Sequence, residues 1–164
     1  MTEVWGALRV LHEHQISHGD LCCGEITVHD GRVQFGGFDN AEYGATDAQL
    51  QSDIAQLLVT TSAMYDPPSA VAAAIEAFGQ DTVLIASRRL TKTAVPARIR
   101  ESVTDAKTVI AAAREQVQQQ TGADKIRTET ITRFTRMQLV QLVLWVALVY
   151  VCLLYTSPSP RDRS

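Results

Sequence analysis

An uncharged apolar run near its C-terminal end constrains the fold of this 164-residue chain more than any other feature. The run "MQLVQLVLWVALVYVCLLY" starts at residue 137, and its 19 residues suffice for one helix to cross the hydrocarbon core of a membrane. Trp145 and Tyr150 are compatible with such a span. We therefore expect a transmembrane helix over 137–154. The alternative, a buried core helix, would need a larger host domain than this chain offers.

The charges ahead of this run predict its orientation. Basic residues precede it, namely Lys125, Arg127, Arg133 and Arg136. Because short cytoplasmic segments carry an excess of Lys and Arg, the N-terminal part is expected in the cytoplasm and the protein at the cell membrane. The membrane is thus an expected partner.

Composition excludes several classes of protein. The net charge of −3 argues against nucleic acid as a partner, because such binding depends on Lys and Arg that meet phosphates. Cys22, Cys23 and Cys152 form neither an even set nor a CxxC motif, so we expect no disulfide framework. The first residues lack a basic region followed by an apolar core, which argues against a signal peptide.

Hydrophobic periodicity predicts a mainly helical chain with one small β-hairpin. Apolar residues recur at helical spacing over 3–15, 48–63 and 68–79, and 97–120 resembles one long amphipathic helix. The segment 25–35, "EITVHDGRVQF", alternates apolar and polar residues on both sides of the turn "HDG", which indicates a hairpin. The segment 35–49 is rich in Gly and Asn and is expected to be a loop.

Asp20 lies between the first helix and the hairpin. A loop carboxylate in that place could accept a proton from a substrate hydroxyl. A second acidic group at the end of the hairpin could hold Mg²⁺ beside it, and phosphoryl transfer needs both functions. The structural alternative is that Asp20 only caps or bridges a turn. His12 and His14 point to different helix faces, so no metal site is expected from the histidines.

The residues around Asp20 resemble those of a known enzyme family. "HGDLCCGEITV" resembles the catalytic loop His-x-Asp-Leu-x-x-x-Asn of protein kinases and of aminoglycoside-type small-molecule kinases, with matches at His18, Asp20 and Leu21. "GFDNAEYG", with Phe38, resembles the metal-binding loop of that family. "QSDIAQLL" resembles a later helix whose acidic residue ties down the catalytic loop, which implies this structural role for Asp53.

Departures from the family pattern predict a degenerate site. Glu25 stands at the Asn position of the loop, and Gly37 stands at the position of the metal-binding Asp. A shift of the alignment by two residues would offer Asp39 as the metal ligand instead. The first Lys of the chain is Lys92, so the Gly-rich loop and strand Lys that bind nucleotide phosphates have no match ahead of Asp20.

These observations predict four segments. A degenerate kinase C-lobe-like unit is expected over 1–96, followed by a linking amphipathic helix and a basic juxtamembrane stretch over 97–136. The transmembrane helix follows over 137–154, and a tail over 155–164. This Ser-, Pro- and Arg-rich tail is expected to be disordered. It resembles translated sequencing-adapter DNA, which implies that it is not native and that the natural protein continues.

This order of segments resembles actinobacterial membrane proteins related to the lysylphosphatidylglycerol synthase transmembrane family, which carry a kinase-like domain ahead of their membrane part. The resemblance implies a truncated, membrane-anchored pseudokinase-like protein, inactive as this chain and without a cofactor. Its soluble part would bind a protein partner or regulate its own missing membrane domain.

One alternative function is that of an active small-molecule or protein phosphotransferase that uses Mg-ATP, with Asp20 as base and Glu25 or Asp39 on Mg²⁺. The other is a structural part of a lipid-related integral membrane protein.

Overall fold

The structure is a computed structural model that describes residues 1–122 and 136–155, with the side chains of the last helix described from residue 140 onward. The chain divides into a first unit, Met1–Glu129, and a second unit, Thr130–Ser164. Most of the expected basic stretch, and the expected tail from residue 156 onward, lie outside the described residues.

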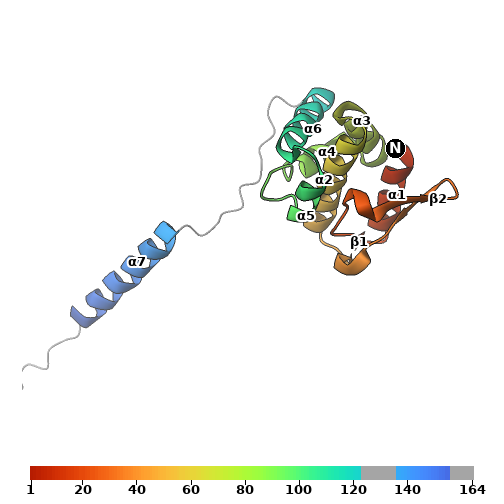
Figure 1. The fold of residues 1–164 in the computed structure, drawn as a ribbon. Coiled ribbons are helices and arrows are strands. Elements are labelled where there is room, and N and C mark those ends of the chain that lie inside the picture. Colours follow the sequence, from red (N-terminus) through yellow and green to blue (C-terminus); the bar gives the residue numbers. More distant parts are fainter. Residues whose placement is uncertain (123–135, 156–164) are drawn as a thin grey trace, which may run out of the picture. The chain divides into compact units, whose positions relative to one another are not determined.

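The first unit is mainly helical, as the sequence predicts (Figure 1). Its helices are α1 (Thr2–Glu13), α2 (Asp47–Met64), α3 (Pro67–Phe78), α4 (Gln80–Ser87), α5 (Ala97–Ser102) and α6 (Ala106–Thr121). The start of α3 shows how the sequence sets a boundary. The Asp66 carboxylate accepts a hydrogen bond from the backbone N–H of Ser69 at 2.8 Å, and Pro67 occupies the first helical position.

Two short antiparallel strand pairs accompany the helices. β2 (Ile26–His29) and β3 (Arg32–Phe35) form the expected hairpin, in which Ile26 pairs with Phe35. The turn between them uses Asp30 at φ 49° and Gly31 at φ 74°, the left-handed conformations that a tight two-residue hairpin turn requires. β1 (Ile16–Ser17) pairs with β4 (Glu42–Tyr43), which lies within the segment expected to be a loop. This second pair brings the chain before and after the hairpin together.

α2 is the central helix of the first unit. It lies among α3, α4 and α6 (Figure 1). Thr46 and Gln49 form a reciprocal capping box at its start, which satisfies free N–H groups of the first turn. Every residue from Asp53 to Ser62 is buried, so this part of the helix is covered on all sides. Several of these buried residues are polar, which requires partners inside the protein.

The expected long helix over 97–120 is broken in the structure. α5 ends at Ser102 and α6 starts at Ala106, after Asp105 in a left-handed conformation with φ 52°. Ile110, Ala113 and Val117 of α6 are buried in the core of the first unit, next to α3 and α4. α6 is therefore a core helix rather than the expected linking helix, and the first unit extends past the expected boundary at residue 96.

The second unit contains α7 (Arg136–Tyr155), whose described side chains are all exposed. No helix within the described part of the chain is long and apolar enough to cross a membrane, so the expected transmembrane helix over 137–154 is wrong. Gln138 and Gln141 interrupt the apolar run near its start. The uninterrupted part, 142–155, would span about 21 Å, whereas a hydrocarbon core is about 30 Å thick. The expected localisation at the cell membrane depended on this helix, and the structure does not support it.

Candidate functional site

A buried carboxylate of α2 holds the Asp20 loop, residues 18–21. Asp53 is fully buried, and its two oxygens accept hydrogen bonds from the backbone N–H groups of His18 at 2.7 Å and Gly19 at 2.9 Å. The Nε2 atom of His12 lies 3.3 Å from the same carboxylate. Hydrogen bonds to a charged acceptor are stronger than neutral ones, so these contacts fix the path of the backbone just before Asp20. The resemblance implied this contact for Asp53.

Two more polar side chains extend the contact from Asp53 along α2. The Oε1 atom of Gln56 accepts a hydrogen bond from the backbone N–H of Leu21 at 3.0 Å, and the Thr60 hydroxyl donates to the Leu21 carbonyl at 2.6 Å. Positions 53, 56 and 60 follow the i, i+3, i+7 spacing of one helix face. Both backbone polar groups of Leu21 are thus satisfied while its side chain is buried. α2 thereby positions the backbone on both sides of Asp20.

The ring of His18 connects the Asp20 loop to the end of the hairpin. Its Nε2–H donates to the Gly36 carbonyl at 2.7 Å, and its Nδ1 accepts from the backbone N–H of Asp20 at 3.3 Å. These two bonds assign the ring proton to Nε2. The ring packs against Phe35 and Phe38, with centroid separations of 5.7 and 4.7 Å. His18 is buried and bonded on both sides, so the structure gives it a positioning role.

One arginine binds two carboxylates of the site. Asp20 is only 3% exposed, and its Oδ2 accepts a hydrogen bond from Nη1 of Arg98 on α5. The other terminal nitrogen of that guanidinium donates to Oε1 of Glu25 at 2.9 Å. The pKa of Arg98 is raised above its ordinary value, chiefly by the Asp20 carboxylate, then by Cys22 and Glu25. The fork of Arg98 therefore bridges Asp20 and Glu25.

Glu25 and Gly37 occupy neighbouring space. Glu25 ends η1 (Cys23–Glu25), and Gly37 precedes η2 (Phe38–Asn40) with φ 63°. A Cβ atom on Gly37 would lie 2.4 Å from Cδ and 2.5 Å from Oε2 of Glu25, closer than any real contact. The Glu25 carboxylate therefore fills the volume in which a side chain at position 37 would begin.

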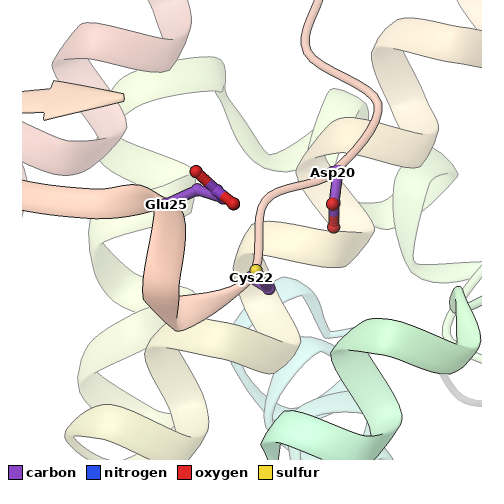
Figure 2. Close-up of side chains that lie close together, drawn as sticks. All are labelled: Asp20, Cys22 and Glu25. Atoms are coloured by element: carbon purple, nitrogen blue, oxygen red, sulfur yellow. The ribbon is translucent and has the colours of Figure 1, made fainter. Parts of the chain in front are cut away.

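Asp20, Cys22 and Glu25 form a compact group of possible ligands (Figure 2). Each offers one ligand atom, and these atoms lie within 4.8 Å of one another. The Cys22 thiol is buried and free, and Oδ1 of Asp20 is buried with no hydrogen-bond partner. Asp39, the alternative metal ligand expected from the sequence, is not part of this group. It lines a cavity of about 510 Å³ on the side of Asp53.

This arrangement limits what Asp20 can do chemically. The Arg98 guanidinium holds Oδ2 of Asp20, and Oδ1 is buried, so neither oxygen is open to the proton of a substrate hydroxyl in this conformation. The lysines in the described part of the chain, Lys92 and Lys107, line a different pocket beside Arg100. The structure thus places Arg98, and not a lysine, against the carboxylates of the site.

Sequence reasoning missed several residues of this site. Arg98 lies 78 positions from Asp20, and no local pattern connects two residues that far apart. No motif in the sequence marks Cys22, whose ligand atom lies within 4.8 Å of those of both carboxylates. Gln56 and Thr60 could have been found, since polar residues at i+3 and i+7 from Asp53 lie on the helix face that the resemblance turns toward the Asp20 loop.

The chain matches no protein-family model, and neither a curated protein nor a solved structure matches it.

Proposed function

We propose that the first unit is a degenerate kinase C-lobe-like module that lacks phosphotransferase activity and binds a protein partner. The observation that carries this proposal is the Arg98 guanidinium bound to both Asp20 and Glu25. A general base must be available to the proton that it removes, whereas Arg98 holds one oxygen of Asp20 and the other oxygen is buried.

The kinase-like part of the proposal draws on the surroundings of the Asp20 loop. A buried acidic residue on a central helix binds the backbone of the loop, and a histidine two residues before Asp20 binds the end of the hairpin. In the family that the sequence resembles, the matching acidic residue ties down the catalytic loop. Asp53 and His18 supply these contacts here.

The loss of activity draws on positions 25 and 37. In the family pattern these positions hold Asn and Asp, which bind metal ions beside the nucleotide. This chain has Glu25 and Gly37, and the Glu25 carboxylate occupies the space of the missing side chain. The acidic side chain that position 37 lacks is thus replaced, in volume and in charge, by the side chain of Glu25. The carboxylate that results is bound by Arg98 rather than presented to a metal-bound phosphate.

Calorimetry with nucleotide tests the loss of activity. We expect no binding of Mg-ATP or Mg-ADP tighter than roughly millimolar, which corresponds to about 4 kcal/mol. Micromolar binding that requires Mg²⁺ and is lost in Asp20→Asn and Glu25→Gln would instead support the phosphotransferase alternative. Asp30→Asn provides the matched control, because Asp30 is exposed in the turn of the hairpin and lies outside the ligand group.

The partner-binding part draws on exposed apolar side chains of the segment 26–43. Val28, Phe38 and Tyr43 are 70%, 47% and 87% exposed. A photo-crosslinking residue at position 43, in the native host, should join the chain to one defined protein. The same residue at the exposed position Gln119 of α6 serves as control. Identical products from positions 43 and 119, or none from position 43, would contradict a specific surface at this segment.

A further inference from the structure

We propose that Asp20, Cys22 and Glu25 form a binding site for a divalent transition-metal ion of the Zn²⁺ type, and that Arg98 closes this site when no metal is bound. The inference rests on the positions of these side chains alone. It holds whether or not the kinase-like interpretation is correct.

The ligand atoms are already close to the required arrangement. They lie within 4.8 Å of one another and surround a common space (Figure 2). Ligands of a tetrahedral zinc site are separated by roughly 3.3–3.7 Å, given metal bonds of about 2.0–2.3 Å. Small side-chain rotations would close the difference. Asp20 and Cys22 flank Leu21 in the chain. Gln56 and Thr60 form hydrogen bonds with the backbone of Leu21, so the backbone that carries these two ligands is held in place.

An unpartnered buried atom gives independent support for a ligand in this place. Asp20 is only 3% exposed, and its Oδ1 atom is buried and accepts no hydrogen bond. Buried carboxylate oxygens almost always have a partner. Arg98 satisfies only Oδ2. A cation between the three side chains would satisfy the remaining oxygen.

The donor set selects the class of metal. Mg²⁺ and Ca²⁺ prefer oxygen ligands alone, whereas a thiolate with two carboxylates favours Zn²⁺ and metals that resemble it. Three protein ligands also leave one position of a tetrahedron open for water. The Cys22 thiol has to lose its proton to become a ligand, so binding of the metal releases that proton to solvent.

Arg98 competes with the metal for the same two carboxylates. Its guanidinium bridges Asp20 and Glu25, and a positive charge there repels a divalent cation. The Arg98 side chain is 62% exposed, so it can turn into solvent without breaking the core. We therefore expect the metal to enter as Arg98 leaves, and removal of Arg98 should tighten metal binding.

Cobalt spectroscopy on the full chain tests this inference. Cys23→Ser and Cys152→Ser leave Cys22 as the single thiol, because the chain contains three cysteines. Co²⁺ should bind one per chain and produce a thiolate-to-cobalt charge-transfer band, which Zn²⁺ abolishes and excess Mg²⁺ does not. Arg98→Met should lower the Kd at least tenfold. Asp20→Asn and Glu25→Gln should each raise it at least tenfold, and Asp39→Asn should leave it unchanged.

Clear outcomes would overturn the proposal. These are the absence of the charge-transfer band, a band that survives Cys22→Ser, and displacement of Co²⁺ by equimolar Mg²⁺. Circular dichroism of each variant shows whether it is folded. If Asp20→Asn fails to fold, Glu25→Gln and Arg98→Met still decide, since Glu25 and Arg98 are more exposed than Asp20. A Kd that Arg98→Met leaves unchanged would refute the role of Arg98.

Discussion

The Glu25 carboxylate lies where the side chain of any residue other than glycine at position 37 would begin, with only 2.4 Å between Glu25 Cδ and a Cβ atom on Gly37. Gly37 also has a left-handed backbone, with φ 63°. A substitution at position 37 therefore meets two separate obstacles, the strained backbone and the occupied volume.

Gly44 allows these two obstacles to be separated. It has a similar φ of 67°, and nothing lies within 4 Å of a Cβ atom placed on it. Gly44→Ala should cost roughly 1–2 kcal/mol for the left-handed backbone alone. Gly37→Ala should cost more, because Glu25 must also move away from Arg98.

Urea unfolding of the full chain measures both effects. The fluorescence of Trp5, which is fully buried, reports on the first unit in a Trp145→Phe background. In a Glu25→Ala background the volume is free, so the two glycine substitutions should become equal in cost. A difference that persists in that background would show that Glu25 is not the obstacle.

Asp53 should contribute more to stability than Asp20. Asp53→Ala would leave the buried N–H groups of His18 and Gly19 without an acceptor, at about 1–3 kcal/mol for each. Asp53→Asn keeps one oxygen acceptor and should lose about half as much. Asp20→Asn retains an oxygen for Arg98 and should have the smallest effect. The same unfolding curves test this order, and equal, small effects at both positions would remove the main support for the kinase-like interpretation.

Thr60 and Thr61 form a matched pair on α2. The Thr60 hydroxyl donates to the carbonyl of Leu21 at 2.6 Å, whereas the Thr61 hydroxyl donates only to Leu57 of its own helix at 2.6 Å. Thr60→Val should therefore cost about 1–3 kcal/mol, because the buried carbonyl of Leu21 loses its donor. Thr61→Val should be nearly neutral, since the Leu57 carbonyl remains within the helical ladder. Equal costs would mean that the Leu21 contact adds no stability.

The sequence predicted the parts of the fold that local patterns determine. The hairpin follows from alternation on both sides of the turn that contains Asp30 and Gly31, and α2 and α3 follow from apolar periodicity. These signals act within a few residues of the chain. For the same reason they placed Asp20 correctly in a loop between a helix and the hairpin.

Contacts between distant segments could not be predicted in this way. The break between α5 and α6 depends on the burial of Ile99 and Ile110 against the same core, and helical spacing alone continues through it. The position of Arg98 beside Asp20 depends on that break. The expectation at α7 failed for a different reason, since it rested on the absence of charge over 137–155, whereas no helix in the described part of the chain is long and apolar enough to cross a membrane.

Arg98 and Asp20 should be energetically coupled. Arg98→Met would leave the buried Asp20 carboxylate without its cationic partner, so the first unit should become less stable in metal-free buffer with a chelator present. In an Asp20→Asn background no buried charge remains, and the same substitution should cost less. A double-mutant cycle from unfolding curves measures this difference.

High salt should reduce the coupling energy between Arg98 and Asp20 only in part, because Arg98 is exposed and Asp20 is not. The parallel cycle with Asp39→Asn serves as control and should show additivity. Added Zn²⁺ should then stabilise Arg98→Met more than the unsubstituted chain, since a ligand that binds only the folded state raises its stability. An additive Arg98–Asp20 cycle would show that the ion pair is a surface contact without influence on Asp20.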